Sequence, residues 1–215
     1  MSKELTVVIP ARDAADTIAA TLHSVLAGAD RLLEVVVVDD ASTDGTAEVV
    51  RAVGDERIRV LPGRGTGPAA ARNDGVADAR GAVIGFSDAD DLWTAGRPDL
   101  RLTALATATA PAVARGLAQV VWQGREVGPP STLLSFSAAL VPVEVLREHP
   151  LDESLERGED VEWFLRVADR GVAVLDVDAV VFRYLRRPGS LSADPHAGLL
   201  AGLGATVRRR RGTTP

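Results

Sequence analysis

Cysteine is absent from this sequence, and several kinds of protein are excluded with it. A chain without thiols has no disulfide framework, no thiolate metal site and no cysteine nucleophile, and it is compatible with a reducing compartment. The N-terminal residues MSKELTVVIP also lack a long apolar run, so they match neither a secretory signal nor a membrane span of about 20 residues. We therefore expect the protein to be cytoplasmic.

Basic residues do not dominate the composition. The formal net charge is −6, which argues against a general nucleic-acid binder, because such binding depends on lysine and arginine neutralising phosphates. With 46% hydrophobic and 25% charged residues, the chain of 215 residues has the composition of one globular domain, which we place at residues 1–207. Residues 208–215 are basic and are expected to be disordered. Their four arginines could attach weakly to an anionic membrane, although a solvated terminus is the simpler interpretation.

Short apolar runs alternate with helical periodicity through the first half of the chain. The expected strands are residues 5–9, 32–38, 57–61 and 82–86, and the expected helices are residues 16–26, 46–52 and 68–79. This alternation predicts an α/β fold with a mostly parallel central sheet flanked by helices. In the less regular second half we expect helices at 99–108, 143–148 and 161–169, and strands at 112–117, 119–121 and 172–181.

Carboxylates follow two of the expected strands. Asp39 and Asp40 follow the run LLEVVVV, and the segment SDADD places Asp88 and Asp90 after the run AVIGF. In an open parallel sheet, ligands bind outside the carboxyl ends of the strands, so both acidic pairs should face one crevice. Asp88 and Asp90 would repel each other unless they shared a cation such as Mg²⁺ or Mn²⁺, which binds carboxylates together with substrate phosphates. A turn or helix cap is the alternative interpretation of SDADD.

Two further loops contain glycine or turn residues. The loop DDASTDGT carries a turn dipeptide and cap residues, so taken alone it is more typical of a structural role. The loop PGRGTGP does not match the dinucleotide fingerprint G-x-G-x-x-G, and we therefore reject a nicotinamide cofactor.

Four segments occur in series: VVIPARDAADTIAATLHSVL, VVVVDDASTDGT, AAARNDGVADARGAVIGFSDADDLW and LDESLERGEDVEWFLRVADRG. Together they resemble family 2 glycosyltransferases, enzymes of the GT-A fold, closely over residues 5–100 and more loosely over residues 135–190. The resemblance implies an inverting enzyme that moves a sugar from a nucleoside diphosphate donor to an acceptor hydroxyl. It also implies a nucleotide-sugar-binding half, residues 1–92, and an acceptor-binding half, residues 93–207.

The resemblance assigns donor binding to residues in the first three segments. These residues are Pro10, Ala11, Arg12, Asp13, Asp40, Arg72, Asp88, Ala89 and Asp90. Asp40 matches the position that contacts the donor base. Asp88 and Asp90 match the DxD motif, whose first acid approaches the ribose and metal and whose second acid coordinates Mn²⁺ or Mg²⁺ at the diphosphate. Asp91 is expected to support this cluster from its edge.

The fourth segment carries the implied catalytic residues. Glu159 and Asp160 match the family's ED motif, whose aspartate is the general base for the acceptor hydroxyl, and Glu159 is left as a supporting or acceptor-side residue. Acids also favour the first turn of a helix, so both residues have a structural interpretation as well. Arg72, followed by Asn73, has two interpretations that stay open: a position near the donor and a position on the surface of a helix.

The sequence departs from the family pattern at the base pocket. Arg12 stands where many members have an aromatic residue that stacks on the base, so the base is left open although a UDP-sugar is the first expectation. Arg186 or Arg187 could meet the diphosphate, and His196 could contact metal or phosphate or be a solvated loop residue. The acceptor is expected to be small or lipid-linked, unless a partner chain or a homodimer completes its site.

Two other functions compete with this interpretation. A nucleotidyltransferase would need a basic, glycine-rich phosphate loop soon after the first strand, and ARDAADTI offers none. A catalytically inactive GT-A homologue could bind a nucleotide or a partner without turnover. The presence of all the expected acids disfavours this second alternative.

Overall fold

The computed structural model describes residues 4–28, 30–95 and 98–186, and it contains one mixed sheet with the strand order β3-β2-β1-β4-β9-β6-β10-β5. The first four strands are β1 (Leu5–Ala11), β2 (Leu32–Asp39), β3 (Ile58–Pro62) and β4 (Val83–Phe86), and they pair in parallel. The others are β5 (Leu92–Trp93), β6 (Ala112–Trp122), β9 (Ala139–Pro142) and β10 (Ala173–Arg186), while β7 (Arg125–Glu126) and β8 (Ser131–Thr132) pair with β6. The predicted α/β class is confirmed.

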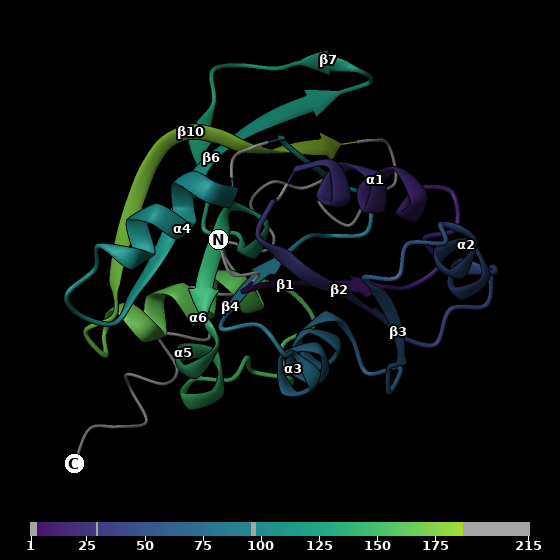
Figure 1. Cartoon of the computed structure of the whole chain (residues 1–215), viewed down its shortest axis with the longest axis horizontal. Helices are drawn as coiled ribbons and strands as arrows, with labels where there is room; N and C mark the ends of the chain where they lie inside the picture. Colours follow the sequence, from purple (N-terminus) through teal and green to yellow (C-terminus); the bar gives the residue numbers. More distant parts are fainter. Residues whose placement is uncertain (1–3, 29, 96–97, 187–215) are drawn as a thin grey trace.

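Helices cover both faces of the sheet (Figure 1). One face packs against α1 (Ile18–Gly28), α2 (Thr46–Ala52) and α4 (Pro98–Ala106), and the other packs against α3 (Pro68–Asp78), α5 (Val143–Glu148) and α6 (Glu159–Ala168). The valines of β2 alternate between the two cores, as a strand covered on both sides requires. None of these helices is both long and apolar enough to cross a bilayer within the described ranges.

The second half differs from the sequence prediction in the extent of its strands. The two strands expected at 112–117 and 119–121 are one continuous strand, β6, because β10 pairs with it from Ala112 to Trp122. Gly116 permits this pairing, since a Cβ atom there would lie 2.3 Å from Cγ1 of Val181. The late strand β10 correspondingly extends to Arg186, beyond the predicted end at residue 181.

Helix α4 contributes a buried cation, Arg101, to the core. Arg101 is 0% exposed, its guanidinium lies 5.0 Å from the ring centre of Trp93, and its nitrogens have no hydrogen-bond partner among the described residues. Burial lowers the pKa of Arg101 to about 9, so the side chain remains charged at neutral pH at a cost to stability.

Replacing Arg101 with methionine is expected to stabilise the fold. Removal of a buried charge that has no hydrogen-bond partner within the described part of the chain should raise the free energy of unfolding by about 2 kcal/mol at pH 7, measured by urea denaturation, even though the contact with Trp93 is also lost. Arg115→Met is the matched control, because Arg115 forms an ion pair with Asp176 and should give no gain. A loss of stability in Arg101→Met would mean that the guanidinium has a partner in the folded chain.

Candidate functional site

The carboxyl ends of the four parallel strands form one edge of the sheet. Ala11 of β1 lies beside Asp39 of β2, which lies beside Pro62 of β3, and Val8 of β1 lies beside Phe86 of β4. Strand β1 lies between β2 and β4, so successive strands are added on one side of β1 up to β3 and on its other side from β4 onwards. This is the position at which open α/β sheets bind ligands. Most of the predicted donor-site residues lie at these strand ends or on the loops that follow them, whereas Arg72 lies on α3.

The loop after β1 is held by the loop after β2. Backbone N–H groups of Asp13, Ala14 and Ala15 donate to the side chains of Ser42, Thr46 and Asp44, at 3.0, 2.8 and 2.8 Å respectively. The hydroxyl of Thr46 and the N–H of Ala15 lower the pKa of Asp44. The segment DDASTDGT thus shapes the neighbouring loop, in which Pro10 and Ala11 end the strand and Arg12 is exposed.

Asp40 is buried beneath the glycine-rich loop that follows β3. Its two carboxylate oxygens accept the N–H groups of Gly65 at 2.7 Å and Gly67 at 2.9 Å, and the side chain is only 3% exposed. The next residue, Ala41, has a φ of 62°, a left-handed conformation that is uncommon for alanine and typical of functional loops. Asp40 therefore supports the loop of residues 63–67 as well as lying at the predicted base position.

The acids of SDADD occupy different environments. Asp88 and Asp90 are partly exposed, whereas Asp91 is 1% exposed and accepts the N–H of Leu185 at 3.3 Å. Burial and the charges of Asp88 and Asp90 raise the pKa of Asp91 well above its ordinary value. Ala89 is held from the other side, because its carbonyl accepts the hydroxyl of Thr21 at 3.0 Å.

Arg72 joins Asp88, which follows β4, to Glu159 at the start of α6. Its guanidinium donates to Asp88 at 2.6 Å and to Glu159 at 2.5 Å, and the residue is only 6% exposed. Burial alone would lower the pKa of Arg72, but the charges of Asp88, Glu159 and Asp160 outweigh it and raise that pKa. Arg72 is therefore not a surface residue on its helix. It supplies part of the positive charge that the acidic cluster requires.

Glu159 and Asp160 begin α6, directly after Gly158, whose φ is 75°. Glu159 is 7% exposed, and Asp160 is partly exposed with one oxygen accepting the N–H of Val161 at 2.7 Å. Burial and the charge of Glu159 raise the pKa of Asp160 to about 7, although Arg72 acts in the opposite direction. A carboxylate with this pKa can accept a proton near neutral pH.

A sequence profile described as Glycosyl transferase family 2 matches residues 6–114. The chain belongs to this family. Among curated relatives, the succinoglycan biosynthesis protein ExoO of Rhizobium meliloti is 43% identical over 97 residues, which cover 45% of this chain and 27% of ExoO. The Escherichia coli glucosyltransferase WfaP is 36% identical over 90 residues, covering 41% of this chain and 36% of WfaP. The matched part is thus a minor part of these relatives.

Solved structures of another protein share the fold. S. aureus TarS 1–349 in complex with UDP-GlcNAc gives a TM-score of 0.75 at 21% identity, covering 89% of this chain and 61% of TarS. The complex of the same protein with UDP gives 0.72 at 22% identity, covering 86% of this chain and 61% of that one. At this identity the likeness supports the architecture, and the predicted GT-A fold is confirmed.

The residues predicted for metal binding in this family 2 chain are compatible with a cation. Asp88 and Asp90 are solvent-accessible, and the buried oxygen Oδ2 of Asp91 has no hydrogen-bond partner among the described residues. No three histidine or acidic side chains in the described ranges are arranged as a complete metal-binding group. Mg²⁺ commonly uses only one or two carboxylates and takes its other ligands from water and phosphate.

Some of the residues predicted to take part in the site lie outside the described residues. Arg187, His196 and the tail 208–215 are outside, and only the backbone of Arg186 is described.

The sequence analysis overlooked Arg64 and Glu153, which form an ion pair at 2.9 Å across the site. The arginine within PGRGTGP was the available hint, but nothing in the sequence indicates its partner.

Proposed function

We propose that this chain is an inverting, metal-dependent glycosyltransferase, with Asp160 as the general base. It would transfer a sugar from a nucleoside diphosphate to an acceptor hydroxyl. The observation that carries the proposal is the bridge formed by Arg72, which joins Asp88 to Glu159. This bridge supports a common site, because Asp90 and Asp160 lie within two residues of the two bridged acids. A donor held at one end of this site would present its anomeric carbon to an acceptor at the other.

The proposed roles follow from the environment of each acid. Asp160, with a pKa of about 7, would take the proton of the acceptor hydroxyl as its oxygen attacks the anomeric carbon. Glu159, neutralised by Arg72, would hold the start of α6 in place. The loop residues Pro10, Ala11, Arg12 and Asp13, together with Asp40, would bind the nucleoside, and Ala89 would line the diphosphate end.

A bound cation would stabilise the negative charge that accumulates on the leaving diphosphate. Asp90 and Asp88 would hold this cation, Mn²⁺ or Mg²⁺, since both are partly exposed oxygen ligands. Arg72 donates to only one oxygen of Asp88, Oδ1, and so balances part of the charge of the acid cluster.

Similar proteins suggest which donor and acceptor to test. TarS was solved with UDP-GlcNAc, and the name of WfaP specifies UDP-Glc and a diphosphoundecaprenol-linked acceptor. We propose a UDP-sugar as the first donor to test and a small or lipid-linked acceptor, with a homodimer or a partner chain completing the acceptor site if neither binds to the isolated chain. We retain residues 1–207 as one catalytic domain in the cytoplasm.

Nucleotide titration tests this proposal. Calorimetry with UDP, GDP, dTDP and CDP, each with and without Mn²⁺, should show metal-dependent binding of one nucleotide that Asp90→Ala weakens at least about tenfold, because the variant loses a charged metal ligand. Asp30→Ala is the matched control, since Asp30 precedes β2 at the opposite edge of the sheet and should leave binding unchanged.

A turnover assay distinguishes an active glycosyltransferase from a catalytically inactive homologue. Release of nucleotide from the matching nucleotide-sugar should require Mn²⁺ or Mg²⁺ and should be lost in Asp90→Ala. Binding of a nucleotide without turnover of any corresponding sugar donor would favour the inactive homologue, and failure of all four nucleotides to bind would remove the donor-site assignment.

A further inference from the structure

The glycine-rich loop of residues 63–67 rests directly on Asp40. Besides the two hydrogen bonds from Gly65 and Gly67, the loop is so close that a Cβ atom on Gly63 would lie 2.9 Å from Cα of Asp40. The N–H of Gly63 also donates to the carbonyl of Asp39 at 2.9 Å. A nucleotide bound at Asp40 would therefore lie against this loop.

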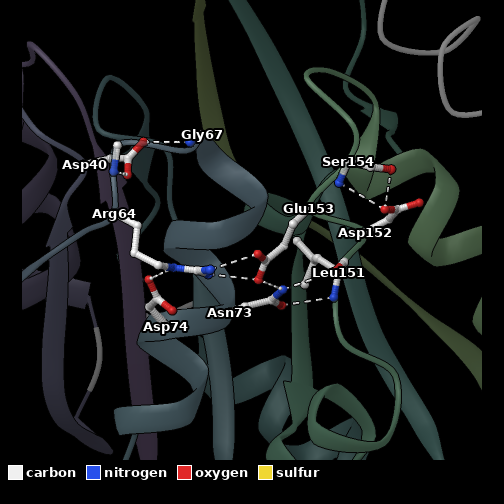
Figure 2. Close-up of polar contacts among 10 residues, drawn as sticks. Asp40, Arg64, Gly67, Asn73, Asp74, Leu151, Asp152, Glu153 and Ser154 are labelled. Carbon is white, nitrogen blue, oxygen red and sulfur yellow. Dashed lines mark hydrogen bonds and ion pairs between the residues drawn. The ribbon is translucent and has the colours of Figure 1, made fainter.

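Arg64 extends from this loop to a segment that is distant in sequence. Its two terminal nitrogens donate to the two carboxylate oxygens of Glu153 at 3.0 and 2.9 Å, and its Nε donates to Asp74 on α3 at 3.0 Å. Figure 2 shows the guanidinium between the two carboxylates. The bidentate geometry fixes both the separation and the orientation of the two segments.

Asn73 fastens the same distant segment to α3. Its amide nitrogen donates to the carbonyl of Leu151 and to Glu153, both at 3.0 Å, and its amide oxygen accepts the N–H of Leu151 at 3.0 Å (Figure 2). Glu153 thus accepts hydrogen bonds from both Arg64 and Asn73, and these donors lower the pKa of Glu153. The segment of residues 151–158 leads from these contacts directly into α6.

Three consecutive residues of α3 therefore connect the parts of the site. Arg72 binds the acids Asp88 and Glu159, Asn73 binds Leu151 and Glu153, and Asp74 binds Arg64. We propose that Arg64 and Glu153 are positioning residues that couple a nucleotide bound at Asp40 to segment 151–158, and through it to Asp160. This inference rests on the proposed function, because it takes Asp40 as part of the nucleotide site and Asp160 as the base.

The exposure of the Arg64–Glu153 pair argues for positioning rather than for stability. Its side chains are 48% and 40% exposed, and exposed ion pairs stabilise folds little. A bidentate pair can nevertheless keep two segments in register, and small errors in the placement of a base lower the rate of reaction strongly. Loss of the pair should therefore affect transfer more than thermal unfolding.

Hydrogen exchange with bound UDP and Mn²⁺, or with whichever of the four nucleotides binds, tests the coupling. In the native protein we expect slower amide exchange both in loop 63–67 and in segment 151–158. In Glu153→Gln the loop should still be protected, whereas protection of the segment should fall below about half, because a neutral amide loses the charge-assisted pair. We expect kcat for transfer to fall about tenfold, with the donor KM within about twofold.

Two variants serve as matched comparisons. Glu156→Gln changes an exposed acid of the same segment and should behave like the native protein. Arg64→Lys keeps the positive charge but cannot form the bidentate pair, so segment 151–158 should retain part of its protection from exchange. The inference is overturned if the nucleotide protects loop 63–67 but never segment 151–158, or if Glu153→Gln leaves the protection of that segment intact. If no nucleotide protects either region, the proposed donor site fails and this inference fails with it.

Discussion

Replacement of Asp160 by asparagine is expected to lower kcat for sugar transfer by about 100- to 10,000-fold, the range measured for loss of a general base. Asparagine has nearly the same shape but cannot accept the proton of the acceptor hydroxyl. Nucleotide affinity should change little, because Asp88 and Asp90 remain in place. Steady-state kinetics and calorimetry on the same preparation would separate these two effects.

The raised pKa of Asp160 gives this prediction a pH dependence. Because the base must be ionised, kcat/KM of the native protein should rise about tenfold per pH unit below pH 7 and level off above it. The folded pKa of about 7 exceeds the ordinary aspartate pKa of 3.8, so the charged form is disfavoured in the folded state. Asp160→Asn should therefore increase the free energy of unfolding at pH 8 by about 1–3 kcal/mol, a gain that disappears towards pH 4.

An acid directly after the same helix provides the comparison. Asp169→Asn, at the exposed C-terminal end of α6, should leave both kcat and its pH profile unchanged. Retention of more than about a tenth of the native kcat in Asp160→Asn would argue against a general base at this position. A flat profile of kcat/KM between pH 6 and pH 8 would argue against it independently.

Replacement of Arg72 by methionine is expected to destabilise the protein by about 3–5 kcal/mol, the loss typical of breaking a buried ion pair from one side. The substitution leaves Glu159 buried without its cation and removes the partner of Asp88. Since Arg72 lowers the pKa of Asp160, the pH at which Asp160 ionises should also move upwards. Urea denaturation at pH 8 measures the first effect, and the pH profile of any residual activity measures the second.

Two arginine variants keep this prediction testable if Arg72→Met does not fold. Arg72→Lys retains the charge and should lose less stability, although it cannot reproduce the two directed contacts. Arg57→Met removes an arginine from a more exposed pair with Asp55, and it should cost less than about 1 kcal/mol. Equal losses in Arg72→Met and Arg57→Met would mean that the acids around Arg72 do not depend on it.

The strands and the acidic strand ends were predictable because their causes are local. The near-continuous valines of β2 can be buried only in a strand that is covered on both faces, and the residue that leaves such a strand is polar because it reaches the edge of the sheet. The helix over 46–52 was predicted with its observed bounds. The sequence analysis separated β6 into two strands because its continuity depends on pairing with β10, which comes some sixty residues later in the chain.

The sequence by itself determined the α/β architecture and the candidate acids, Asp40, Asp88, Asp90, Glu159 and Asp160, because apolar periodicity and residue chemistry are properties of short segments. The tertiary structure alone decided which charges meet. Arg72 and Glu159 are 87 positions apart, and Arg64 and Glu153 are 89 positions apart. No local pattern specifies such pairs, since they depend on where the folded chain brings residues 151–160 beside residues 64–74. The partial neutralisation of the acidic cluster, and the link from Asp40 towards Asp160, therefore arise only in the folded protein.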